Sequence, residues 1–241
     1  MVHAILSDIH GNLEALEAVL EDLERVKPAS VACLGDFVGY GASPNECIER
    51  LRPRLAEAVV GNHDLAAVGR LALNGFHADA AVAARWTDGA LTPENRAYLE
   101  SLPLERIWHG ARLTHAAPAA PASWRYVLSA RDAKVELAAF GERVCFIGHT
   151  HFPCTFERDA AELRYSRAEA FPLEPGHRYL VTVGSVGQPR DGDPRAAYLL
   201  YDDEAGLVRH VRREYDVAGA MRRIVEAGLP SFLADRLQWG E

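Results

Sequence analysis

Residues 4–10 read AILSDIH, a short apolar run that passes directly into an aspartate and a histidine. The apolar part has the length and composition of a buried β-strand. Asp8 and His10 are both residue types that bind metal ions, and their i, i+2 spacing would put both side chains on one face of an extended segment. This stretch therefore predicts a strand whose carboxyl end carries a functional site.

Four further apolar runs end in the same way. Residues 31–34 lead to Asp36, residues 58–60 lead to GNHD at 61–64, residues 112–114 lead to His115, and residues 146–147 lead to GHTH at 148–151. The carboxyl ends of strands in an open α/β sheet are where sites assemble. Five of the ten histidines fall at these strand ends: His10, His63, His115, His149 and His151. We expect them to meet in one site.

Helical patterns separate the early strands and predict an α/β fold. They cover residues 12–26 and begin again after Ser43, Thr92 and Ser129, which favours a parallel or mixed sheet with helices outside. The last third changes to short strands at 154–156, 163–165, 179–183, 197–201 and 208–211, typical of an antiparallel section. Helices at 217–226 and 230–237 follow. We interpret residues 1–241 as a single domain, with 216–241 as a helical extension packed on it.

Composition excludes several classes of protein. The 241 residues contain 26 Lys and Arg against 34 Asp and Glu, a net charge of −8, which disfavours a duplex nucleic acid as partner. No apolar stretch is long enough for a membrane span, and the N-terminal run turns polar too early for a signal peptide. Four cysteines form no metal-binding or redox motif and are expected to be buried free thiols in the cytoplasm: Cys33, Cys47, Cys145 and Cys154.

The five polar blocks stand in a recognisable order. Asp8-x-His10, Gly35-Asp36, GNHD at 61–64, His115 and GHTH at 148–151 resemble the signature of the calcineurin-like metallophosphoesterases. The resemblance extends over about residues 1–190, and the loop at 184–190 is similar to one in small bacterial phosphodiesterase-like members. It implies an α/β/β/α sandwich of mixed sheets flanked by helices.

The resemblance also implies a ligand set for two divalent transition-metal ions. One ion would be held by Asp8, His10, Asp36 and His151, and the other by Asp36, Asn62, His115 and His149, so that Asp36 bridges them. Mixed histidine, aspartate and asparagine ligands suit Mn, Fe, Zn or Ni. The assignment of His115 as a ligand rests on a strand end and on chain order alone, and a purely structural role is the alternative.

The same resemblance implies hydrolysis of a phosphoester. A hydroxide bridging the two ions would attack phosphorus, and His63, with its pKa near the ordinary 6.5, would protonate the leaving group. The catalytic residues would then be His63 and Asp36. The substrate would be a small phosphoester, and a nucleotide fits this description.

The sequence departs from the Ser/Thr protein phosphatase branch after Asp36. Gly39 stands where that branch has an aspartate that orients the catalytic histidine, and Tyr40 stands where it has a phosphate-binding arginine. This difference favours a small phosphodiester and leaves open what orients His63. Asn62, Tyr40 and Arg190 are candidate substrate-binding residues, although Arg190 has an alternative role in pairing with Asp191 or Asp193.

Two other functions remain as alternatives. One is a phosphomonoesterase or Ser/Thr protein phosphatase, and the other is a non-catalytic binding scaffold of the same fold. The full ligand set together with His63 favours an enzyme over a scaffold. Comparing the rates on a diester and a monoester with the same leaving group would distinguish the two kinds of enzyme. Oligomeric state is not encoded in any readable pattern.

Overall fold

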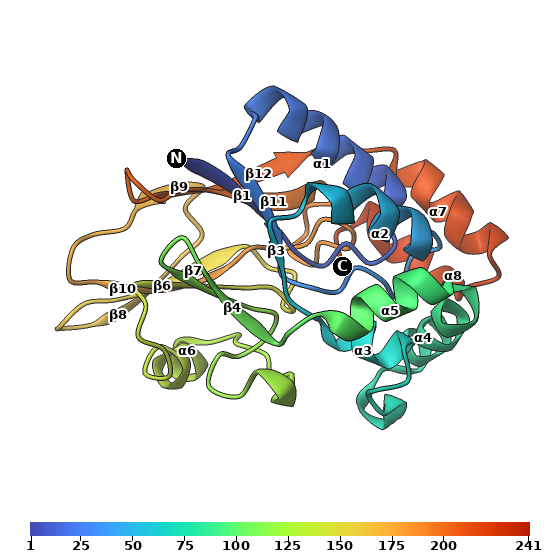
Figure 1. Ribbon diagram of the computed structural model, residues 1–241, viewed down its shortest axis with the longest axis horizontal. Helices are drawn as coiled ribbons and strands as arrows, with labels where there is room; N and C mark the ends of the chain where they lie inside the picture. Colours follow the sequence, from blue (N-terminus) through green and yellow to red (C-terminus); the bar gives the residue numbers. More distant parts are fainter.

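The computed structural model describes residues 1–241 and contains two six-stranded sheets (Figure 1). The first has the strand order β3-β2-β1-β11-β12-β9. Its strands are β1 (Val2–Leu6), β2 (Ser30–Cys33), β3 (Glu57–Ala58), β9 (Ala170–Pro172), β11 (Ala196–Asp202) and β12 (Leu207–Arg213). The second has the order β4-β5-β6-β10-β7-β8. Its strands are β4 (Glu105–Trp108), β5 (Ala111–Thr114), β6 (Val144–Ile147), β7 (Cys154–Arg158), β8 (Leu163–Ser166) and β10 (Arg178–Thr182).

The two sheets pack face to face and helices cover their outer faces, which confirms the predicted α/β/β/α architecture. Between the sheets, Ile5 and Ala32 of the first sheet belong to one apolar cluster with Phe146 and Val181 of the second. Sheets bury one face against each other in this way because their inward residues alternate with outward ones. The helices are α1 (Leu13–Val26), α2 (Pro44–Leu51), α3 (Asn62–Ala67), α4 (Ala78–Ala90), α5 (Pro93–Ser101), α6 (Ala130–Glu136), α7 (Val217–Glu226) and α8 (Ser231–Asp235).

Each outer face has its own helices. The outward residues Ala4 and Leu6 of β1 pack against Leu16 and Val19 of α1, and α6 covers the opposite side (Figure 1). Asn12 caps α1, its side chain accepting the N–H of Ala15 at 3.1 Å. This cap starts the helix after the polar residues that end β1, so those residues stay in the connecting loop.

Early and late strands share each sheet, which the order of elements along the chain did not reveal. β11 lies between β1 and β12 and is antiparallel to both. β10 is antiparallel to β7 but parallel to β6, so the last third is not a separate antiparallel section. The parallel pairs β1–β2 and β5–β6 bring the ends of four strands to one edge of the sandwich.

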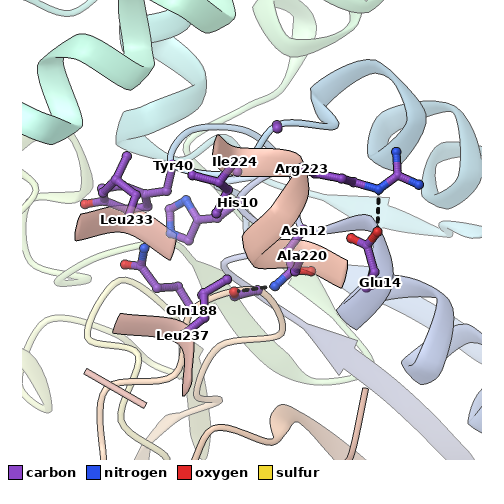
Figure 2. A pocket seen from close by; sticks show the side chains of 14 residues that line it. His10, Asn12, Glu14, Tyr40, Gln188, Ala220, Arg223, Ile224, Leu233 and Leu237 are labelled. Atoms are coloured by element: carbon purple, nitrogen blue, oxygen red, sulfur yellow. Dashed lines mark hydrogen bonds and ion pairs between the residues drawn. The ribbon is translucent and has the colours of Figure 1, made fainter. Parts of the chain in front are cut away.

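The C-terminal helices close over the loop that follows β1. α7 has the predicted bounds, whereas the second helix is shorter than predicted, with α8 followed by a 3-10 turn at Arg236–Gln238. Figure 2 shows Leu233 of this segment beside Tyr40 and Leu237 beside Gln188, with Arg223 of α7 paired with Glu14 of α1. The interpretation of residues 1–241 as one domain stays a prediction.

Two further expectations concern the chain as a whole. All four cysteines are buried and unpaired, as predicted. None of the helices has both the length and the apolar character required to traverse a membrane.

Candidate metal centre

Two clusters of metal-binding side chains lie where β1, β2, β5 and β6 end. Each cluster supplies three buried ligand atoms within 4.8 Å of one another: Asp8, His10 and His151 in the first, and Asp36, His115 and His149 in the second. Asp36 links the clusters, because its Oδ2 lies 3.6 Å from His10 Nε2 and 3.2 Å from His115 Nε2. These groups are the ones that the resemblance implied, and their role as ligands stays a prediction.

Every histidine of the clusters is held by a backbone carbonyl through one ring nitrogen. His10 donates from Nδ1 to Val38 (3.1 Å), His115 from Nδ1 to Leu34 (2.7 Å), His149 from Nε2 to Trp124 (2.8 Å) and His151 from Nδ1 to Gln188 (2.5 Å). A carbonyl oxygen only accepts, so the proton of each neutral ring is on the anchored nitrogen. The other nitrogen then faces the centre with its lone pair, as a metal ligand must.

Several atoms at the centre lack the partners that burial normally requires. Asp36 Oδ2 is buried and has no hydrogen-bond partner. The Nε2 atoms of His10 and His151 face each other at 3.1 Å, and Asn62 directs its Oδ1 to within 3.2 Å of His115 Nε2. Buried acceptors facing one another without donors are costly, and a divalent cation would satisfy them. The residues present therefore fit a pair of metal ions.

The charges of the clusters agree with this fit. Burial opposes ionisation of Asp36, but the nearby His115 and His63 hold the pKa of its carboxyl well below its usual range. Burial lowers the pKa of His149 to about 4 and that of His151 to about 3. These groups are thus ionised carboxylate and neutral imidazole at neutral pH, the forms that bind metals. His115 differs, because Asp36 and Asp8 overcome its burial and raise its pKa to about 9, so a metal ion would have to displace a proton from its Nε2.

The side chains converge through an unusual backbone rather than through extended segments. Asp8, His10, Asp36, His149 and His151 all have positive φ, between 50° and 65°. The expectation that Asp8 and His10 share a face because they lie in an extended stretch is therefore wrong. Left-handed conformations cost non-glycine residues roughly 1–2 kcal/mol each, and such strain concentrates at functional sites.

Position 61, directly before Asn62, requires a glycine because two loops approach each other closely there. A Cβ at this position would lie 2.0 Å from Asp36 Oδ1 and 2.4 Å from the Asp36 nitrogen. Only glycine lets the two loops come this near to each other. Gly61 therefore allows the short distance between Asp36 and the loop that carries His63.

Asp64 is a residue of the site that the sequence analysis did not assign. Its carboxylate is fully buried and accepts the backbone N–H groups of Gly61 (3.0 Å), Asp36 (2.9 Å) and Val38 (3.3 Å). These bonds tie the loop after β2 to the start of α3. The GNHD motif contained the signal, but an aspartate in such a motif equally suits a simple turn.

His63 lies beside the clusters and belongs to neither. Its backbone N–H donates to Asp36 Oδ1 at 2.8 Å, and its ring packs among Tyr40, His10 and Phe76 at centroid distances of 4.4, 4.9 and 5.0 Å. His63 Nδ1 has no hydrogen-bond partner. Aromatic packing, and no carboxylate, therefore orients this ring.

The expectation of an ordinary pKa for His63 is wrong. Burial holds the pKa of this imidazole well below 6.5, although the Asp36 carboxylate opposes that shift. A substrate phosphate beside the ring would add negative charge and raise the pKa again. The protonated form of His63 is therefore favoured by bound substrate and not by the free protein.

Gly39 lies against the same ring, so we expect Gly39→Ala to disturb it. A Cβ there would lie 2.6 Å from His63 Nδ1, and Gly39 has a φ of +92°. We expect at least about a tenfold loss of phosphoesterase activity with unchanged metal content, together with roughly 1–2 kcal/mol lower stability from the backbone. Activity assays, elemental analysis and thermal unfolding measure the three quantities.

Gly110→Ala is the matched control for that variant. Gly110 also has positive φ (+72°), and a Cβ there would meet nothing within 4 Å. It should lose comparable stability and keep its activity. Full activity of Gly39→Ala would contradict the role of this glycine in positioning His63.

A cleft of about 650 Å³ opens in front of His63, Asn62 and His149. The predicted substrate-binding residues Tyr40 and Arg190 line it. Arg190 donates from Nη2 to Tyr40 Oη (3.2 Å) and to Gln188 Oε1 (2.8 Å). The alternative pairing of Arg190 with Asp191 or Asp193 is absent, since those carboxylates pair with other arginines: Arg167, Arg195 and Arg212.

The fold and the clusters together define a metallophosphoesterase-type protein. The calcineurin-like phosphoesterase superfamily domain matches residues 1–205, and the chain belongs to this superfamily. The family typically binds divalent metals, and membership in it supports a phosphoester hydrolase.

Relatives of this chain extend over its whole length. It is 39% identical over 241 residues to an uncharacterized protein of Methanocaldococcus jannaschii, covering 98% of this chain and 97% of that one. It resembles the crystal structure of a metallophosphoesterase from Sphaerobacter thermophilus with a TM-score of 0.90 and 40% identity, covering 100% of this chain and 99% of the other. A hypothetical protein from Pyrococcus horikoshii, at 20% identity, shares the fold with a TM-score of 0.80, over 100% of this chain and 98% of its own.

Proposed function

We propose that the protein is a dinuclear metal-dependent phosphodiesterase for small substrates, with His63 as the general acid. The observation that carries this proposal is the pair of buried clusters linked by Asp36, whose Oδ2 has no hydrogen-bond partner. Asp8, His10, Asp36 and His151 would hold one ion, and Asp36, Asn62, His115 and His149 the other. Mn, Fe, Zn or Ni suits this donor set.

Bound divalent ions would supply an activated water and positive charge for the phosphoryl oxygens. The chain contributes the rest of the chemistry. Asp36 orients the loop of His63 by accepting its N–H, and the ring of His63 lines the cleft in which a leaving group would lie. A proton transferred from this imidazole to the departing oxygen lowers the barrier for poor leaving groups.

The surroundings of His63 support a diester rather than a protein phosphomonoester. Tyr40, and no arginine, packs on His63 at 4.4 Å. A bidentate arginine at this position would suit the dianion of a monoester. Arg190 instead packs over the Tyr40 ring, with its Cζ 5.5 Å from the ring centroid.

The test compares two esters with the same leaving group. The metal-stripped protein is reloaded separately with Mn, Fe, Ni, Zn or Mg and assayed on bis(p-nitrophenyl) phosphate and on p-nitrophenyl phosphate. We expect activity with one or more of the transition metals and about tenfold or greater kcat/KM for the diester. A preference for the monoester would favour the phosphomonoesterase alternative, and no hydrolysis together with no bound metal would favour the binding scaffold.

A further inference from the structure

The cleft in front of His63 has a second cationic residue from the C-terminal segment. Arg236 follows α8 and lines the cleft together with Arg190. Residues 206–241 lie outside the family match, which ends at residue 205. Arg236 therefore comes from a part of the chain that the family's metal site does not require. The inference drawn below rests on the proposed phosphodiesterase function.

Neither arginine is neutralised by a side-chain carboxylate. Arg190 bonds only to Tyr40 Oη and Gln188 Oε1, and its buried Nε has no partner. Arg236 donates from Nε to the terminal carboxylate of Glu241 at 2.5 Å, and its Cζ lies 5.4 Å from the centroid of the Phe232 ring. Most other arginines of this chain form ion pairs with Asp or Glu, for example Arg112 with Glu105 and Glu142.

The two guanidinium groups also repel each other. Burial and then the charge of Arg190 lower the pKa of Arg236 from its ordinary value. Asp79 is the acidic residue that lines the cleft. Asp79 and the Glu241 terminus offset part of this charge, so an anionic ligand would bind by pairing with Arg190 and by competing with the terminus for Arg236.

Aromatic rings surround the space beside these charges. Phe76, Trp124, Tyr126 and Phe232 line the same cleft. Tyr126 stacks on His149 with centroids 4.1 Å apart and planes at 14°, yet remains 48% exposed, and Phe232 is 54% exposed. Exposed rings at the edge of a cleft offer flat apolar surface to the organic part of a ligand.

We propose that Arg190 and Arg236 form a second anion-binding subsite, so that the preferred substrate is a phosphodiester that carries a further phosphate group on an organic moiety. The reacting phosphate lies at the two clusters, the further phosphate lies between the arginines, and the organic moiety packs on the rings. The segment that contains α8 is then a specificity element, because it supplies both Arg236 and Phe232 to the cleft.

A matched pair of esters tests this subsite on the metal-loaded protein. One is thymidine 5′-(p-nitrophenyl phosphate), and the other is the same ester with a 3′-phosphate, so that only the further phosphate differs. We expect kcat/KM to favour the 3′-phosphorylated ester by about 10–100-fold, the value of one to two charge-assisted hydrogen bonds, with most of the effect in KM. Arg236→Gln should reduce this ratio to about one.

Three further variants separate charge from folding. Arg236→Lys keeps the charge and should retain part of the preference, whereas Arg190→Gln, on a different segment, should also lose it. Arg85→Gln removes one exposed arginine outside the cleft and should keep the wild-type ratio. If the wild-type protein hydrolyses both esters equally well, this inference is overturned and the proposed function stands. The same holds if Arg236→Gln and Arg190→Gln both keep the preference. Hydrolysis of neither ester by the metal-loaded protein overturns the proposed function and this inference together.

Discussion

Replacement of His63 by alanine is expected to abolish most turnover while leaving the metal content unchanged. His63 belongs to neither ligand cluster, and its Nδ1 has no partner whose loss would disturb the fold. General acid catalysis contributes about 100–10,000-fold, and we expect a loss of that size on a dinucleoside monophosphate, whose leaving group is a basic alkoxide. On bis(p-nitrophenyl) phosphate the loss should be smaller, because p-nitrophenolate leaves without protonation.

The dependence on the leaving group separates proton donation from a structural role. A merely structural histidine would reduce both rates equally. His177→Ala is the control, since His177 lies away from the cleft and bonds to Glu157 at 2.6 Å. A rate close to that of the wild type on the dinucleoside monophosphate would refute the assignment of His63.

The isosteric change Asp36→Asn is expected to impair binding of both metal ions. Its Oδ2 lies within 3.6 Å of nitrogen atoms from both clusters, so an amide there weakens each site at once. An amide nitrogen in place of Oδ1 would point its protons at the His63 N–H, which is itself a donor, and in place of Oδ2 it would offer a metal ion no lone pair. We expect the stoichiometry, measured by elemental analysis after dialysis, to fall from about two ions to one or fewer, and activity to fall by roughly 1,000-fold or more.

Asp22→Asn is the matched control for that variant. Asp22 is also a buried carboxylate, bonded to Tyr198 Oη at 2.5 Å and to Arg213 at 2.7 Å, and it belongs to neither ligand cluster. It should lower stability and leave the metal content intact. Retention of two ions by Asp36→Asn would refute the role of Asp36 as a ligand shared by both ions.

Much of the candidate site could be predicted because residue types that bind metal ions directly follow buried strands in the sequence. Asp8 and His10, and likewise His149 and His151, follow buried strands directly, and the edge at which parallel strands end is common to all of them. Asn62 and His115 follow the same logic, and His115 donates to Leu34 so that its Nε2 faces Asp36. These predictions required only residue type and the position of each strand.

Other features depended on contacts between distant segments. The left-handed backbone at Asp8 and His10 is visible in no sequence pattern. The ring of His63 is oriented by Tyr40 and Phe76, and the loop at Gly39 lies against it. The position of β11 between β1 and β12 likewise depends on pairing between strands that lie far apart along the chain.

The amino-acid sequence by itself was enough to predict the fold class and the strand-end residues that meet at the candidate metal centre, because strand periodicity and polar strand ends are local properties, and the order of its motifs was enough to recognise the family. Only the tertiary structure decided how these residues are oriented and what else faces the cleft. Asp64 joins two loops through three backbone amides, and Arg236 reaches the cleft from the C-terminal segment. Both depend on long-range packing, in which side chains far apart along the chain are buried together, and no local pattern encodes that.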